Sequence, residues 1–142
     1  MLKGKNVPRV VVGALIFDHD QRLFLMRSSG KFEDQWIIPG GKVDFGESLI
    51  EGLHREILEE TNLSIRDVQF CGVRELIQPD RHFIFHEYKA VAANPQEVRL
   101  NAEATEHVWV NQAQLSNFNI AEPTLELVRD HWLRSAKAGE RE

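Results

Sequence analysis

Residues 41–63, GKVDFGESLIEGLHREILEETNL, decide the fold of this chain. The stretch opens with a glycine-rich turn and continues as a predicted helix that begins near Glu47 or Ser48, where the serine side chain can cap it. The helix is expected to end at Asn62, because asparagine tolerates the left-handed conformation in which many helices terminate. Four apolar side chains recur at helical spacing and form the stripe expected to face the core: Leu49, Ile50, Leu53 and Ile57.

The same helix carries a dense acidic run near its C-terminal end. Glu56, Glu59 and Glu60, called the helix carboxylates from here on, stand at positions i, i+3 and i+4 and share one face beside the apolar stripe. Like charges this close repel each other and weaken the helix unless a counter-ion binds. Hard divalent cations such as Mg²⁺ prefer oxygen ligands of this kind. The pattern therefore predicts a metal site held against the body of the domain.

Size and composition predict one domain, residues 1–142, with a frayed tail from about 137 to 142. A net charge of −5 disfavours nucleic-acid binding, which usually needs a basic patch. The only cysteine, Cys71, excludes an intramolecular disulfide and a cysteine-based zinc cluster, and it is expected in the core. No membrane span or signal peptide is recognisable, so a cytoplasmic protein is expected.

The rest of the chain alternates apolar runs with turn-forming residues. Strands are predicted at Val10–Phe17, Leu23–Met26, Trp36–Ile38, Val68–Ile77, His82–Ala92 and Val108–Val110, the first two as a hairpin. Residues 39–41 are expected to stop the third strand, and residues 94–105 to form a polar loop. One helical turn is predicted at 113–115, and a last helix from Pro123 to about Ser135. These elements predict an α/β or α+β sandwich, whose strand order the periodicity leaves open.

Eight positions of the opening stretch match a known signature at its spacings: Gly41, Glu47, Arg55, Glu56, Ile57, Glu59, Glu60 and Leu63. The stretch resembles the Nudix box, with Asn62 where the family has a second glycine, a change that asparagine accommodates at modest cost. The first strand, the Trp36–Gly41 approach and the strand at Trp109 are also similar to Nudix hydrolases. The resemblance implies an α/β/α sandwich with a mixed sheet, in which the box forms a loop-helix-loop catalytic motif.

The resemblance also implies a reaction, the hydrolysis of a nucleoside diphosphate linked to another moiety with Mg²⁺ or Mn²⁺. The metal ligands it implies are the helix carboxylates and the backbone carbonyl of Gly40. A helix carboxylate, or a glutamate on a later loop, then accepts a proton from the attacking water. The later-loop residue is expected to be Glu103, as a metal ligand or base, with Glu106 in reserve.

Further residues are expected to position the site or the substrate. Arg55 and Glu47 are expected to orient the catalytic site by hydrogen bonding. Arg27, Arg74 and Arg81 are candidates for contacting the substrate phosphates, although surface arginines are commonly just solvated. A small-molecule nucleotide is the expected partner, and homodimerisation is left open.

Three functions are compatible with these residues. The first is a MutT-like nucleoside triphosphate pyrophosphatase that releases a monophosphate and pyrophosphate, because residues 100–110 and 119–127 resemble members of that type. Ala121 stands where a base-reading asparagine is expected, which argues against a specialist for oxidised guanine. The second is a nucleotide-sugar or ADP-ribose hydrolase, which shares the box. The third is a non-catalytic ligand sensor, which the full set of helix carboxylates disfavours.

Overall fold

A computed structural model describes residues 7–30 and 32–133, which form seven strands and several short helices around them. The strands are β1 (Arg9–Phe17), β2 (Leu23–Ser28), β3 (Trp36–Ile37), β4 (Gly40–Lys42), β5 (Ile65–Gln78), β6 (Arg81–Ala92) and β7 (Ala104–Val110). The helices are α1 (Leu49–Thr61), a 3₁₀ helix η2 (Gln112–Asn117), α2 (Glu122–Val128) and a π-helical turn η3 (Arg129–Leu133).

The sheet is mixed, and β1 lies at its centre. The main strand order is β3-β2-β1-β6-β5, with β4 also paired to β1 and β7 also paired to β2. β1 runs parallel to β6 and antiparallel to β4 and β2. The unbroken apolar run of β1 follows from this place, because a central strand covered on both faces needs apolar side chains on both.

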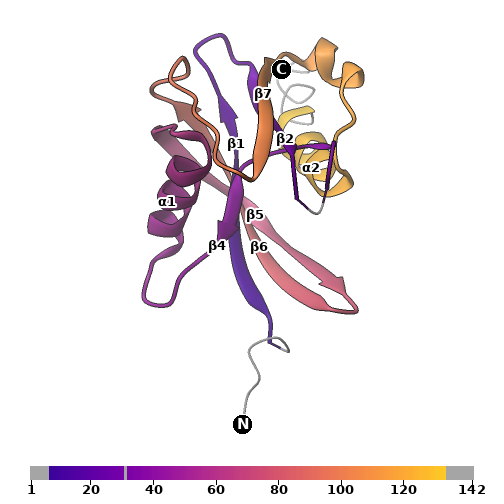
Figure 1. The fold of residues 1–142 in the computed structure, drawn as a ribbon. Helices are drawn as coiled ribbons and strands as arrows, with labels where there is room; N and C mark the ends of the chain where they lie inside the picture. The colour runs from indigo at the N-terminus through magenta and orange to yellow at the C-terminus, as the bar shows by residue number, and fades with distance from the viewer. Residues whose placement is uncertain (1–6, 31, 134–142) are drawn as a thin grey trace, which may run out of the picture.

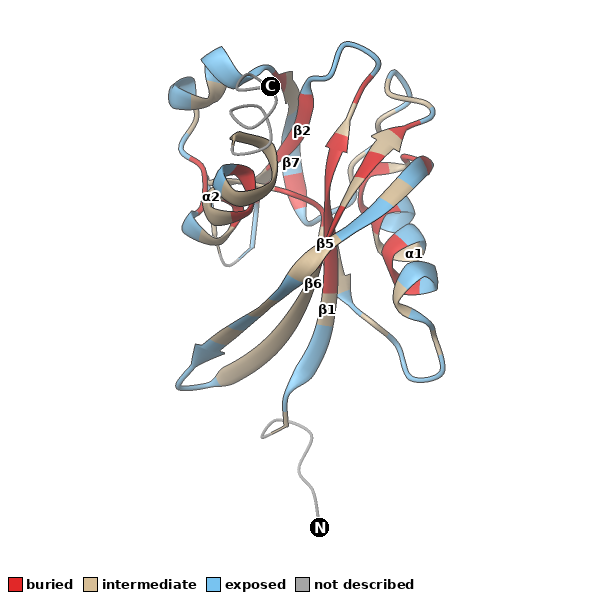
Figure 2. Ribbon diagram, turned by 180° about the vertical axis from the view of Figure 1, so that it is seen from behind, coloured by how far each residue is buried: buried red, intermediate tan, exposed pale blue. Residues whose placement is uncertain are grey.

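Helices cover both faces of the sheet, as Figures 1 and 2 show, with α1 on one side and α2 on the other. Val12, Ala14 and Ile16 of β1 pack in the cluster beneath α1, together with Leu53 and Ile57. Leu15 packs instead in the cluster beneath α2, with Leu127 and Val128. The expected sandwich with a mixed sheet is confirmed. None of the helices formed by residues 7–30 and 32–133 has the length and apolar character to cross a membrane.

Helix α1 has the ends that its sequence predicts. The Ser48 hydroxyl accepts from the backbone N–H of Glu51, whose side chain accepts from the Ser48 N–H in return, a reciprocal capping box. Asn62 closes the helix with a φ of 66°. Of the four stripe residues, Leu53 and Ile57 are fully buried, whereas Ile50 is 43% exposed. The expected core position of Ile50 is wrong, whereas its neighbour Leu49 packs against the core at intermediate exposure.

Several element boundaries differ from the sequence-based prediction. Gly40–Lys42 continues the sheet as β4 instead of ending it, since the glycines allow a close approach to β1. β7 begins at Ala104, inside the expected polar loop. The last helix changes to π-helical geometry after Val128, and its expected end at Ser135 and the tail from 137 lie outside the described residues.

Cys71 is a further correction. It is only half-buried, because β5 is an edge strand of the sheet and its pairing with β6 is irregular between Phe70 and Gly72. The β5–β6 hairpin extends beyond both helices, and Figure 2 shows its far end in the colours of intermediate and exposed residues. The expected core position of Cys71 is therefore wrong.

Candidate metal centre and substrate cleft

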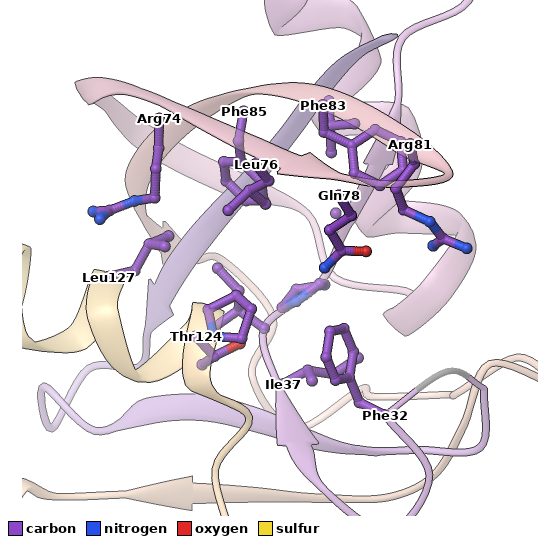
Figure 3. A pocket seen from close by; sticks show the side chains of 15 residues that line it. Phe32, Ile37, Arg74, Leu76, Gln78, Arg81, Phe83, Phe85, Thr124 and Leu127 are labelled. Atoms are coloured by element: carbon purple, nitrogen blue, oxygen red, sulfur yellow. The ribbon is translucent and has the colours of Figure 1, made fainter. Parts of the chain in front are cut away.

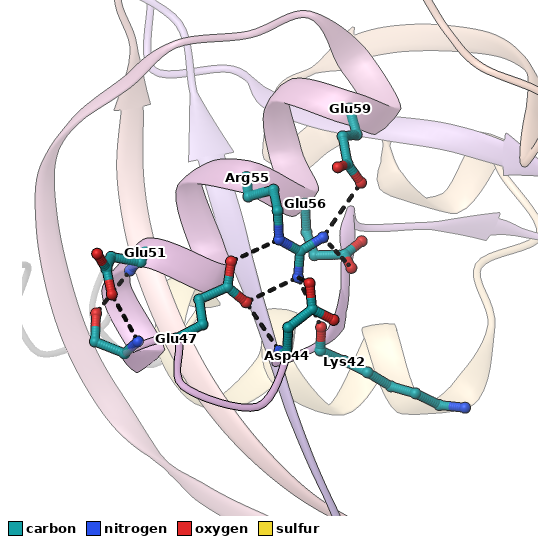
Figure 4. A network of polar contacts seen from close by, with 8 residues as sticks. Lys42, Asp44, Glu47, Glu51, Arg55, Glu56 and Glu59 are labelled. Atoms are coloured by element: carbon teal, nitrogen blue, oxygen red, sulfur yellow. Dashed lines mark hydrogen bonds and ion pairs between the residues drawn. The ribbon is translucent and has the colours of Figure 1, made fainter.

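Arg55 ties the loop before α1 to the helix carboxylates (Figure 4). Its Nε and one terminal nitrogen donate to the two carboxylate oxygens of Glu47, at 2.6 and 2.9 Å. The other terminal nitrogen donates to Glu56 at 3.1 Å and to Glu59 at 3.3 Å. A further bond at 3.0 Å reaches the backbone carbonyl of Lys42. One guanidinium thus ties the loop to three glutamates and offsets part of their negative charge.

The pairing with Arg55 also sets the charge of Glu47. The Arg55 hydrogen bonds, followed by the backbone N–H of Asp44, lower the pKa of Glu47 to about 2. In return, the carboxylate of Glu47 raises the pKa of Arg55 further above its ordinary value. Both groups are therefore charged near neutral pH, and their role in orienting the site stays a prediction.

The two glycines of β4 bring its backbone against neighbouring groups. A Cβ placed on Gly41 would lie 2.4 Å from the carboxyl carbon of Glu56. A Cβ on Gly40 would lie 2.3 Å from the carbonyl oxygen of Val12. Both distances are far shorter than van der Waals contact. Any larger residue would therefore displace the Glu56 carboxyl group from Gly41, or the backbone of β1 from Gly40. The Glu56 carboxyl group is thus held between Arg55 and the backbone of β4.

Glu60 is the most deeply placed of the helix carboxylates. Its exposure is 2%, and one of its carboxylate oxygens accepts from the backbone N–H of Gly40 at 3.1 Å. Burial, a hydrogen bond with Glu56 and the charge of Glu103 together raise the pKa of Glu60 to about 10. In the absence of a cation the buried carboxyl group therefore keeps its proton. The backbone around it closes further where the N–H of Asn101 donates to the carbonyl of Glu60.

This donor set fits a hard divalent cation. Glu56 and Glu60 each place a carboxyl group against the glycine backbone of β4, at Gly41 and Gly40. Within residues 7–30 and 32–133, no three side chains of the usual ligand types form a complete cluster, since Glu59 is 57% exposed and bonded to Arg55. Mg²⁺ commonly binds through one or two carboxylates, with water and substrate phosphates as its other ligands. The Glu56–Glu60 pair fits such a partial site.

The later-loop glutamates differ from each other. Glu103 is exposed, but it lies close enough for its charge to act on Glu60, and its backbone carbonyl accepts from the N–H of Ser29. Glu106 forms an ion pair with Arg27. Only Glu103 therefore faces the carboxylate pair with no arginine bound to it in the described part of the chain.

A cleft of about 220 Å³ adjoins the carboxylate pair at Gly40, which lines it. Its apolar walls come from β6, β5, the segment before β4, and α2: Phe83, Phe85, Leu76, Phe32, Ile37 and Leu127 (Figure 3). The polar side chains along it are those of Arg74, Gln78, Arg81 and Thr124. Figure 3 shows the amide of Gln78 directed into the cleft from the hairpin, opposite Thr124. Apolar walls with a few polar groups are typical of a ligand site.

The three expected phosphate-binding arginines are placed differently. Arg27 pairs with Asp34 and Glu106 at the surface between β2 and β7. Arg74 lines the cleft, but its guanidinium is bound by three carboxylates, those of Glu87, Glu126 and Asp130. Arg81 stands at the open end of the cleft, with its guanidinium carbon 5.8 Å from the centre of the Phe83 ring and an ion pair to Asp80.

Comparison with known proteins now adds to this geometry. Residues 7–134 match the model of the NUDIX domain family, which is most of the chain. The chain belongs to the Nudix family. The structure places the box of that family as the resemblance implies, with a loop, α1 and a second loop in sequence.

Nudix relatives of the chain carry several different activities. The chain is 25% identical to the human 8-oxo-dGDP phosphatase NUDT18 over 124 residues, 87% of this chain and 38% of that protein. It is 28% identical to the nucleoside triphosphatase NudI of Escherichia coli K12 over 111 residues, 70% of this chain and 78% of that protein. The MutT protein of Methanosarcina mazei superposes with a TM-score of 0.74 at 25% identity, over 92% of this chain and 96% of that one. The chain thus spans well under half the length of NUDT18.

Sequence reasoning missed part of this Nudix site. Phe32 lies in a polar loop and Thr124 in the last helix, and neither position carries a signal that links it to a cleft. Gln78 follows directly on the strand predicted at Val68–Ile77, and that place at a strand end is the one signal that could have suggested a side chain at the cleft. Asp44 belongs to the Arg55 network at 3.4 Å, and only its acidic character near Glu47 hinted at that.

Proposed function

We propose that this protein is a nucleoside triphosphate pyrophosphatase that uses Mg²⁺ or Mn²⁺ and releases a nucleoside monophosphate and pyrophosphate. The proposal takes residues 1–142 as one Nudix domain. The observation that carries it is the contact between the cleft and the Glu56–Glu60 pair, which meet at Gly40. A nucleoside held in the cleft extends its phosphates toward those carboxyl groups.

The residues of the metal centre divide the work. Glu56, Glu60 and the carbonyl of Gly40 would hold the cation, which would neutralise phosphate charge and lower the pKa of bound water. Arg55 keeps Glu56 in place, and Glu47 keeps Arg55 in place. A proton leaves the attacking water for a nearby carboxylate. Glu103 suits that role, since its exposed side chain lies near Glu60 with no arginine bound to it among the described residues.

The cleft suits a nucleobase. Phe83 and Phe85 offer apolar wall, while the Gln78 amide can donate and accept hydrogen bonds. Ala121, the residue before α2, is 1% exposed and has no polar side chain with which to read a base. This argues against an oxidised-guanine specialist, although NUDT18 carries that name. The similarity to NudI, named a nucleoside triphosphatase, supports triphosphates instead.

The test is a hydrolysis panel with product identification, run at millimolar Mg²⁺. It contains the common nucleoside triphosphates, nucleotide sugars, ADP-ribose and a dinucleoside polyphosphate. Release of pyrophosphate and a monophosphate from a triphosphate is the expected result. Faster cleavage of ADP-ribose or a nucleotide sugar replaces the triphosphate assignment with the second function. Inactivity on every compound favours a ligand sensor.

A matched pair of variants tests the metal assignment. Glutamine has the shape of a protonated glutamate, the form that Glu60 prefers without a cation, so Glu60→Gln should fold. Its kcat should fall about 100-fold or more, because the metal-assisted step loses a ligand. Glu75→Gln makes the same change on an exposed residue of β5 whose neighbours Arg74 and Leu76 line the cleft, so Glu75 faces away from it. Its activity should stay within about twofold of the parent. Equal activity of both variants overturns the metal assignment.

A further inference from the structure

Two basic residues that no motif singles out lie on the cleft side of the sheet. Arg9 is paired with Phe83 across β1 and β6, and Lys42 is paired with Val11 across β4 and β1. Phe83 and Val11 both line the cleft. Because residues directly opposite each other on neighbouring strands point to the same face, the side chains of Arg9 and Lys42 leave the sheet on the side of the cleft. Figure 4 shows Lys42 extending away from the Arg55 network.

Arg81 completes a row of three cations with these two. It stands two residues before Phe83 on β6, and Arg9 stands two residues before Val11 on β1. Strand spacing and rise put each Cα about 8 Å from the next, in the order Lys42, Arg9, Arg81. The row begins on β4, directly after the glycines that contact Glu56 and Glu60, and follows the mouth of the cleft to the tip of the hairpin.

The row is short of negative charge. Arg81 has an exposed ion pair with Asp80, whereas no carboxylate in residues 7–30 and 32–133 lies in ion-pair range of Arg9 or Lys42. Arg74, on the same face, is already bound by three carboxylates. Three neighbouring positive charges repel one another, and an anion bound among them relieves that repulsion. Arginine and lysine are also the side chains that recognise phosphate best.

We propose that Lys42, Arg9 and Arg81, called the basic rim, bind the phosphate groups of the substrate that lie beyond the bond being cleaved. This inference rests on the proposed function and narrows its substrate class. A triphosphate brings additional charged oxygens to the rim. A nucleotide sugar has only one phosphate group beyond the same bond, followed by a neutral sugar, so it gains less from the three cations. The basic rim therefore selects triphosphates over nucleotide sugars.

The first test compares charge-removing variants on two substrates. Arg9→Gln and Lys42→Gln should each raise KM for the best triphosphate about fivefold with kcat nearly unchanged, the effect of one solvent-exposed ion pair. Both should raise KM for a nucleotide sugar by a clearly smaller factor. Arg9→Lys, which keeps the charge, should recover most of the loss. The control is Arg66→Gln, which removes the same charge from the start of β5, where Arg66 pairs with Val91 of β6. An equal effect of Arg66→Gln, or an unchanged KM in Arg9→Gln, overturns the inference.

The second test needs no catalysis. Inorganic tripolyphosphate is titrated into the parent protein and into Arg9→Gln by calorimetry, at low salt and at about 1 M salt, where charges are screened beyond roughly 3 Å. Weaker binding to Arg9→Gln at low salt, with the difference lost at high salt, supports the basic rim. If the protein hydrolyses no triphosphate but shows this difference, the proposed function fails, and the rim is an anion-binding site with no role in selecting the substrate. If triphosphates are hydrolysed and the difference is absent, the rim alone fails.

Discussion

Gly41→Ala should separate activity from folding. The added Cβ would lie 2.4 Å from the carboxyl carbon and from one carboxylate oxygen of Glu56, so the carboxyl group has to move by about 1 Å or more to reach an ordinary contact distance. A displacement of about 1 Å at a reacting centre costs on the order of 100-fold in rate. The movement itself is cheap for the fold, because the end of a flexible side chain gives way and the backbone does not. We expect a loss of about 1 kcal/mol in the free energy of unfolding, the size of one weakened hydrogen bond to Arg55.

The assay is Mg²⁺-dependent hydrolysis, with thermal unfolding measured on the same preparations. Gly46→Ala is the control in the same loop. Its φ of 86° disfavours alanine, but nothing lies within 4 Å of the new Cβ, so it should lose about 1 kcal/mol of stability and keep its rate. Gly40→Ala, by contrast, meets the backbone of β1 and should destabilise the fold itself. Full activity of Gly41→Ala, or a loss of activity explained by unfolding at the assay temperature, refutes the placement of Glu56.

Three further outcomes test the helix and its supports. Glu47→Gln should lower the melting temperature most above about pH 4.5, where the carboxyl group of the unfolded chain is ionised. The difference from the parent should vanish as the pH falls through about 2, the pKa of Glu47 in the folded protein. A constant difference across that pH range contradicts the ion pair with Arg55. Leu53→Ala removes a fully buried side chain between α1 and the sheet and should cost about 2–5 kcal/mol in denaturant unfolding, whereas a cost below about 1 would mean that α1 packs loosely. Ser48→Ala deletes the capping box with Glu51 and should cost about 1 kcal/mol in the same assay, without changing the slope against denaturant.

Local chemistry allowed helix α1 to be predicted closely. Its start at Ser48 and its end at Asn62 depend on short-range hydrogen bonds and backbone preferences, which a stretch of sequence contains in full. The shared face of the helix carboxylates follows from helical geometry in the same way. Their unequal environments do not. Glu60 is buried because the backbones at Gly40 and Asn101 close over it, and both are brought there by tertiary folding.

The substrate cleft was beyond prediction for the same physical reason. It is enclosed by β5, β6, α2 and the segment before β4, which come from widely separated parts of the chain. The partners of Arg74 were equally hidden, because two of its three carboxylates, Glu126 and Asp130, lie beyond the sheet in sequence. The position of Arg9 and Lys42 on the cleft side follows only from strand register. The alternation of side chains within one strand does not reveal which strand lies beside it.

The parallel pairing of β1 with β6 has a consequence for the order of folding. The β5–β6 hairpin joins neighbouring parts of the chain and can form early, whereas β1 must wait for β6, which is separated from it by the whole Nudix box. Contacts so distant in sequence close slowly, because the chain loses entropy before the pairing repays it. The segment after β6 supplies the Asn101 N–H that closes over Glu60, so the surroundings of Glu60 are complete only after β6 is in place. A folding chain should therefore acquire its affinity for Mg²⁺ late, and stopped-flow refolding should show no acceleration by the cation.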